Sequence, residues 1–205
     1  MLAQNPVQFA VMAAAILCAI IVHEYAHGRM ADFFGDPTPR QAGRLTLNPL
    51  VHLDPIGTLM LLFFRFGWAK PVPVNPAYFR DRRRGMLMVA AAGPVSNFTL
   101  ALVAMAGLKI VGGSLANPLT LFLYFLLQYN IWFGLFNLMP VPPLDGSRIV
   151  RPYLRGPAAQ MYWQYERYGM MIMILLVATG VVGFILGPVA KWVVGLLDTL
   201  TFFLN

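Results

Sequence analysis

Long apolar runs dominate the chain, and polar residues gather in short segments between them. An α-helix needs roughly 20 apolar residues to cross a hydrocarbon core of about 30 Å. Because the runs are continuous and do not alternate with polar residues, they predict membrane-spanning helices and exclude the pattern of a membrane β-barrel. The runs cover residues 6–31, 86–111, 119–139, 168–186 and 188–204.

Two segments after the first run break this pattern. Residues 33–54 are rich in Gly, Pro and Asn, with a strand-like stretch at 44–47, and predict a loop or short hairpin. The apolar run at 55–66 is short and predicts a partly inserted or re-entrant element. We therefore expect an all-α polytopic membrane protein, with one domain over residues 1–205. Its bundle should hold about five to six transmembrane or partly inserted helices.

Composition supports the membrane assignment and charge orients it. Of the 205 residues, 59% are hydrophobic and 11% are charged, whereas soluble domains have about 45–50% apolar and 25% charged residues. If the spans alternate simply, all 15 Lys and Arg residues except Lys109 and Lys191 share one side. Cytoplasmic loops are enriched in Lys and Arg, so we expect a multi-pass cell-membrane protein with that side in the cytoplasm. The net charge of +7 then reflects topology, and we expect no nucleic-acid partner.

The first apolar run contains the sequence His23-Glu24-Tyr25-Ala26-His27. On a helix, the two histidines of an H-E-x-x-H motif lie one turn apart on one face and can bind a single Zn²⁺, with the glutamate beside them to activate water. Ionisable residues inside a membrane are costly and usually functional. A polar patch that packs helices together is the structural alternative.

A catalytic zinc ion normally has three protein ligands, so a third donor is required. Asp145 follows the run at 119–139 directly, after a segment broken by three prolines and before Gly146. Broken backbone at membrane depth is tolerated where it lines a cavity, which favours Asp145. The other aspartates, Asp32, Asp36, Asp54, Asp81 and Asp198, lie in less suggestive surroundings.

At these residues the chain resembles the site-2 protease family of intramembrane zinc metalloproteases, especially its short bacterial and archaeal members without PDZ or cystathionine-β-synthase (CBS) domains. That family combines H-E-x-x-H with a distant N-x-x-P-x-P-x-x-D-G motif. The second motif matches here at Asn137, Pro140, Pro142, Asp145 and Gly146. The resemblance extends through residues 43–57, 67–76 and 92–97. It implies that His23, His27 and Asp145 bind one Zn²⁺ and that Glu24 acts as general base and acid.

Other polar residues could support this site. Asn137 and Asn97 are suited to hold a substrate backbone or an oxyanion, although interhelical hydrogen bonding explains Asn97 equally well. His52 could lie behind the metal ligands, but a structural histidine is the more common case. Asp54 should cap the helix that follows it.

The predicted function is hydrolysis of peptide bonds in or near transmembrane segments of membrane proteins, with the bilayer and a transmembrane substrate as partners. Two alternatives are a catalytically inactive protein that binds membrane helices and a metal transporter. A pure binding site would not need Glu24, and a transporter should show repeated halves or several charges along a path.

Overall fold

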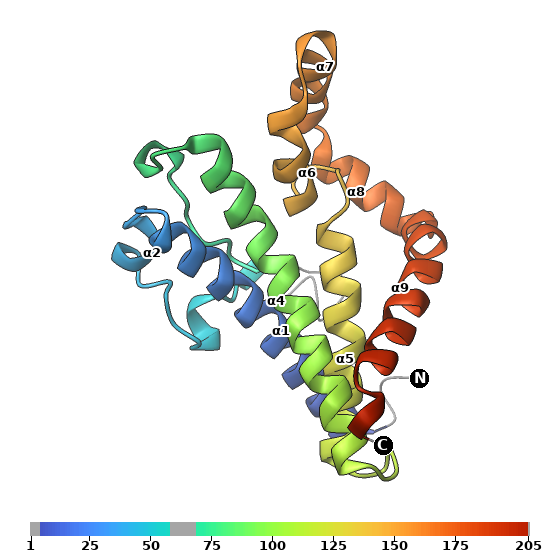
Figure 1. Ribbon diagram of the computed structural model, residues 1–205. Coiled ribbons are helices and arrows are strands. Elements are labelled where there is room, and N and C mark those ends of the chain that lie inside the picture. The colour runs from blue at the N-terminus through green and yellow to red at the C-terminus, as the bar shows by residue number, and fades with distance from the viewer. Residues whose placement is uncertain (1–4, 58–68, 205) are drawn as a thin grey trace.

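The computed structural model describes residues 5–57 and 69–204, and these form helices and connecting loops without a β-sheet (Figure 1). Four helices, α1, α4, α5 and α9, are long and apolar enough to cross a membrane, and α8 is a shorter apolar helix. This confirms the expected all-α polytopic fold. The elements are α1 (Pro6–Phe33), α2 (Thr38–Gln41), η1 (Pro49–Val51), η2 (Pro76–Tyr78), α4 (Arg82–Val111), α5 (Pro118–Asn137), α6 (Asp145–Val150), η3 (Arg151–Tyr153), α7 (Gly156–Glu166), α8 (Gly169–Ala178), α9 (Val181–Leu200) and η4 (Phe202–Leu204).

Capping side chains mark where three of the long helices begin. The side chain of Asn5 accepts hydrogen bonds from the backbone at the start of α1, and Asn117 does the same for α5. In both helices the next residue is proline, whose fixed φ suits the first helical position. Asp81 caps α4 by accepting from the Arg84 N–H at 3.0 Å. These side chains satisfy backbone donors that the helices themselves cannot.

Helices α1, α4 and α5 pack together side by side, and α9 packs against α4 and α5 (Figure 1). Small residues allow the close approach, as is usual where membrane helices meet. Large apolar side chains such as Phe184, Trp192 and Ile110 point outwards, where lipid would cover them. Six alanines in the long helices are fully buried, namely Ala15, Ala19, Ala31, Ala90, Ala101 and Ala104.

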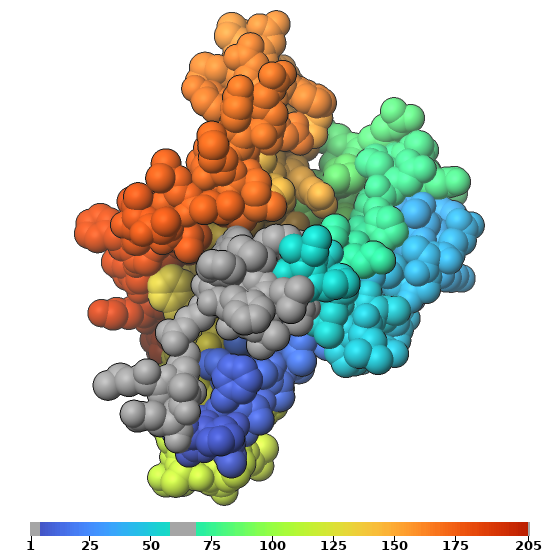
Figure 2. Space-filling model, turned by 180° about the vertical axis from the view of Figure 1, so that it is seen from behind, coloured from blue at the N-terminus to red at the C-terminus, as the bar shows by residue number. Residues whose placement is uncertain are grey.

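The arginine-rich segments lie at one end of the bundle. Helix α1 ends there, α4 begins there, and α5 ends there before the chain enters α6 and α7 (Figure 1). Seen from behind, α7 stands as a separate knob at this end (Figure 2). The sequence-based grouping of basic segments on one side therefore matches the arrangement of the helices.

Two sequence-based predictions of secondary structure are wrong. The run predicted to break at Pro188 breaks instead at Gly180, whose φ of 74° is strained for other residues, and α9 continues through Pro188. The strand-like stretch at 44–47 forms no strand. Thr46 instead makes two local hydrogen bonds. Its carbonyl oxygen lies 2.8 Å from His52 Nε2, and its hydroxyl accepts from the Asn48 N–H at 3.2 Å. Local bonds of this kind compete with strand pairing.

The loop between α1 and α4 contains one isolated antiparallel bridge, between Leu53 and Ala69. Of the predicted re-entrant element at 55–66, residues 55–57 are helical and the rest lies outside the described residues.

Arg44 fastens the two sides of this loop to each other. Its side chain is buried, and its guanidinium donates hydrogen bonds to the carbonyls of Val51, Lys70 and Pro71. Arginine suits this position because its donors are arranged as a rigid planar fork. This arginine, counted above only as a topology signal, is therefore structural.

We predict that Arg44→Lys loosens the loop, because an ammonium group cannot reproduce the fork across three carbonyls. Hydrogen bonds to charged groups contribute about 1.5–3 kcal/mol each, so losing part of the set should speed amide exchange at Lys70 and Val72 by about tenfold or more. Hydrogen–deuterium exchange with mass spectrometry measures this. Arg29→Lys, at an exposed arginine 3.6 Å from Asp32, is the control. Unchanged exchange in Arg44→Lys would refute the fastening role.

Candidate metal centre

Three buried side chains from two distant parts of the chain converge at one point. His23 Nε2 lies 3.0 Å from His27 Nε2, and each lies 3.1 Å from Asp145 Oδ2. All three residues are buried. Within the described residues, this is the one group of His, Cys, Asp and Glu side chains that could hold a metal ion.

Local structure explains how each ligand reaches this point. His23 and His27 are four residues apart on α1 and therefore share one face of it. Asp145 is the first residue of α6, directly after the proline-rich turn. Gly146 is required there because an added Cβ would collide with the carbonyl oxygens of Leu138 and Met139. The Asp-Gly pair thus lets the chain turn closely enough to present the carboxylate.

Hydrogen bonds on the far side of each imidazole fix its tautomer. His23 Nδ1 lies 2.7 Å from Asn97 Oδ1, and His27 Nδ1 lies 2.7 Å from the Val89 carbonyl oxygen. Both partners can only accept, so each Nδ1 carries the proton. In the neutral imidazoles, both Nε2 atoms then present lone pairs towards each other and towards the Asp145 carboxylate.

Such a cluster of lone pairs is repulsive unless a cation lies among them, and the donor set fits Zn²⁺. Zinc binds imidazole nitrogen and carboxylate oxygen at about 2.0–2.2 Å, which places two tetrahedral ligand atoms about 3.4 Å apart. The spacings here, 3.0 Å and 3.1 Å, are within a few tenths of an ångström of that value. His₂Asp also leaves a fourth position open, as catalytic zinc sites do.

Protons on the imidazoles are the other way to relieve this repulsion. Burial raises the pKa of Asp145, but its side-chain contacts with His23 and His27 outweigh burial and hold that pKa well below its usual range. Asp145 is therefore a carboxylate at neutral pH, the form that binds metal.

A buried amide pair supports His23. Asn97 Nδ2 donates to Asn130 Oδ1 at 2.8 Å and to the Ala19 carbonyl at 3.3 Å, which leaves Oδ1 to accept from His23. Asn130 in turn donates to the Leu126 carbonyl at 2.8 Å. Both amides are fully buried. Sequence reasoning singled out Asn97 and missed Asn130, although a polar amide inside the apolar run at 119–139 was the available signal.

Helix α4 approaches the two imidazoles through a glycine. A Cβ on Gly93 would lie 2.5 Å from His23 Cε1 and 2.5 Å from His27 Nε2. Real side-chain contacts are never this close, so only glycine lets the backbone of α4 form this wall of the site. The sequence placed Gly93 in a family-like segment but gave no reason for it.

Glu24 is held from outside the metal cluster. Its Oε2 accepts a hydrogen bond from the Val72 N–H at 3.0 Å. Val72 directly follows Lys70 and Pro71, whose carbonyls accept hydrogen bonds from Arg44. The loop between α1 and α4 thus orients the carboxylate next to the two histidines. One oxygen of Glu24 is used in this bond, and among the described residues the other accepts no hydrogen bond, so it could bind a water molecule.

The remaining candidate residues lie apart from the three ligand side chains. Asn137 Nδ2 donates to the Phe133 carbonyl of its own helix at 3.0 Å. His52 is buried in the loop between α1 and α4 and bonds the Thr46 carbonyl. Asp54 Oδ1 accepts from the Gly57 N–H at 2.8 Å, as a helix cap does. The structure therefore brings Asn97 to the ligands but gives Asn137 and His52 no contact with them among the described residues.

We predict that Gly93→Ala lowers zinc content strongly, because the added methyl group overlaps both imidazoles. Metal analysis of the purified protein measures the zinc bound per chain. Gly195→Ala in α9 is the matched control, since nothing lies within 4 Å of its added Cβ. If Gly93→Ala retained full zinc content while folding normally, the close approach of α4 would be refuted.

We predict that Asn97→Ala weakens zinc binding by about 10–100-fold, the usual effect of removing a residue that orients a metal-bound histidine. Titration with a competing chelator gives the affinity. Asn137→Ala removes an amide that bonds only its own helix, so its zinc affinity should be unchanged. Equal affinities in the two variants would argue against the role of Asn97.

Comparison with known proteins gives a consistent result. The sequence profile of peptidase family M50 matches residues 108–180, which include α5, the turn and Asp145. The chain is 38% identical over 181 residues to the Bacillus subtilis protein named "Putative zinc metalloprotease YwhC", covering 84% of this chain and 82% of that protein.

Two Mycobacterium tuberculosis proteins with the same form of name are more distant. Rip2 is 27% identical, covering 82% of this chain and 66% of its own length, and Rip3 is 28% identical, covering 85% and 39%. No solved structure matches the chain. These relatives support a metalloprotease role and zinc as its metal. On the identity and coverage of the Bacillus subtilis relative, the chain belongs to peptidase family M50, the site-2 protease family.

Proposed function

We propose that this protein is a zinc-dependent endopeptidase that cuts peptide bonds in or near the transmembrane segments of other membrane proteins. One observation carries the proposal: His23, His27 and Asp145 converge with ligand spacing at a buried point, and Glu24 lies on the same helix beside them. In this assignment the first three bind the metal and Glu24 is the general base and acid.

The bound Zn²⁺ would polarise the scissile carbonyl and lower the pKa of a water molecule to near neutrality. Glu24 removes a proton from the attacking water as its oxygen bonds to the carbonyl carbon, and then delivers that proton to the amine nitrogen as the C–N bond breaks. The products are a carboxylate and an amine. The Val72 N–H holds Glu24 Oε2 throughout, so the carboxylate keeps its orientation between the two proton transfers.

The orientation of the site in the membrane follows from the arginine-rich end. Lys and Arg are enriched in cytoplasmic loops, and α1 carries His27 close to its arginine-rich end. We infer a multi-pass protein of the cell membrane, with the metal centre near the cytoplasmic face. Peptide hydrolysis requires water, and in this orientation water reaches the site from the cytoplasm.

The two alternative functions account for fewer of these features. An inactive helix-binding protein would have no use for a carboxylate fixed beside two metal-binding histidines. A transporter would need further ionisable groups along a path, and the part of the chain that the structure describes has one such metal group.

We predict that Glu24→Gln abolishes cleavage of a single-span model peptide by at least about 100-fold, the contribution expected of a general base. Glutamine can still accept from the Val72 N–H, so zinc content and folding should be unchanged. The assay compares purified wild-type and variant protein in bilayers, with a chelator-treated sample as the metal-free control. Cleavage at the wild-type rate by Glu24→Gln would exclude Glu24 as the base.

A further inference from the structure

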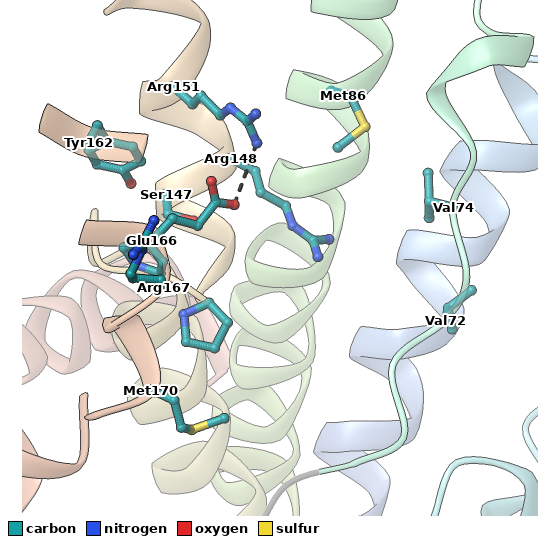
Figure 3. A pocket seen from close by; sticks show the side chains of 12 residues that line it. Val72, Val74, Met86, Ser147, Arg148, Arg151, Tyr162, Glu166, Arg167 and Met170 are labelled. Atoms are coloured by element: carbon teal, nitrogen blue, oxygen red, sulfur yellow. Dashed lines mark ion pairs between the residues drawn. The ribbon is translucent and has the colours of Figure 1, made fainter. Parts of the chain in front are cut away.

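A cationic pocket of about 430 Å³ lies between the segment with Val72 and Val74 and the start of α6 (Figure 3). One wall is the extended segment with Val72 and Val74, and another is formed by the turn at Pro142 and Pro143 with the start of α6. The rest of the lining comes from Met86 of α4 and from α7 with the residues that follow it. The pocket therefore lies between the loop that holds Glu24 and the turn that presents Asp145.

Two lining residues place the pocket next to the proposed site of cleavage. The N–H of Val72 bonds Glu24 directly, and Ser147, also in the lining, is two residues after Asp145. A substrate chain that reaches the metal centre and continues towards the arginine-rich end of the bundle enters this pocket.

The charge of the lining is positive. Three arginines, Arg148, Arg151 and Arg167, face one glutamate, Glu166. Glu166 pairs with Arg151 at 3.6 Å, and Arg151 also lies over the Trp163 ring, 3.7 Å from its centre. For Arg148 and Arg167 the described residues supply no carboxylate within 4 Å. Figure 3 shows the Arg148 side chain extending into the space between α4 and α7.

An adjoining cavity extends this positive surface. It has a volume of about 440 Å³, shares Arg148 and Arg151 with the first pocket, and adds Arg82 and Arg83 from the start of α4. Among the described residues, no Asp or Glu lines this cavity. Arg148 thus stands between two cavities whose combined lining contains five arginines and one glutamate.

From this arrangement we propose that the pocket binds acidic side chains of the substrate, on the stretch that leaves its membrane span at the arginine-rich end. The inference rests on the proposed function and defines its substrate class: membrane proteins with Asp or Glu beside the span that is cut. Arginine forms bidentate bonds to carboxylates. Apolar side chains in the same lining, Val72, Val74, Met86 and Met170, suit the rest of a polypeptide better than a lipid headgroup.

The same charge gives selectivity. Most membrane proteins carry Lys and Arg on their cytoplasmic flanks, and a pocket whose lining has more arginines than carboxylates repels them. The pocket then selects substrates with acidic flanks in two ways, because it attracts their carboxylates and repels the basic flanks of most other membrane proteins. Specificity is often achieved by combining attraction with repulsion.

The test measures binding to full-length Glu24→Gln protein in bilayers of phosphatidylcholine, which has no net charge. Three fluorescent single-span peptides are compared, identical except for three Glu, three Gln or three Lys beside the span. We expect the Glu peptide to bind about tenfold more tightly than the Gln peptide, and the Lys peptide to bind most weakly.

A charge reversal locates the effect. Arg148→Glu should abolish the preference for the Glu peptide and improve binding of the Lys peptide, a gain that a misfolded protein could not show. Arg155→Glu changes an exposed arginine at the start of α7 that lines neither cavity, so the preference should survive there.

Three outcomes would overturn the inference. These are equal binding of the Glu and Gln peptides, equal effects of Arg148→Glu and Arg155→Glu, and an Arg148 effect that is independent of the peptide and appears only with phosphatidylglycerol in the bilayer. The last result would assign the pocket to lipid headgroups. Cleavage of the same peptides by the wild-type protein is measured separately. Cleavage that does not depend on peptide charge would support the protease function and refute the acidic-flank preference. Charge-selective binding without any cleavage would support the binding pocket and refute the protease function.

Discussion

Three lone-pair donors that meet in the interior of an apolar bundle impose the main constraint on this structure. His23 and His27 present unprotonated Nε2 atoms to the Asp145 carboxylate at about hydrogen-bond distance, and a cation among them makes the arrangement favourable. The surrounding elements bring these three side chains together. Helix α1 supplies two ligands one turn apart, α4 approaches them through Gly93, and the turn after α5 brings Asp145 back to the same depth.

Two chains of hydrogen bonds start from neighbouring residues of α1. One runs inwards through the bundle, from His23 to Asn97 and Asn130. The other runs from Glu24 through Val72 to the loop that Arg44 fastens. Hydrogen bonds in a low-dielectric interior hold the groups that make them in fixed positions. The first chain therefore fixes a metal ligand and the second fixes the proposed base, and the two meet only on α1.

The arginine-rich end joins membrane topology to the proposed chemistry. The same basic residues that favour a cytoplasmic location also line the space next to the metal centre. Arg44 shows that such a residue can have a structural role, because it lies buried among carbonyls. Arg148 and Arg167 differ from it in remaining without a carboxylate partner in the described structure, which leaves them free to bind one from outside.

The sequence by itself determined the class of the fold and predicted the candidate metal ligands. Spans follow from the length of apolar runs, and the two histidines follow from a spacing of four, because both are local properties of one helix. Asp145 was favoured by its turn, whose geometry is also local. The break between α8 and α9 was misplaced because Gly180 and Pro188 can each end a helix, and local sequence does not say which one does.

Only the tertiary structure decided which polar groups meet across helices. Asn97 contacts His23 while Asn137, an equally plausible amide, bonds its own helix. The need for glycine at position 93, the bond from Val72 to Glu24 and the burial of Arg44 were likewise invisible in the sequence. Each depends on the rotation and depth at which elements far apart in the chain pack, and no spacing within one segment encodes these.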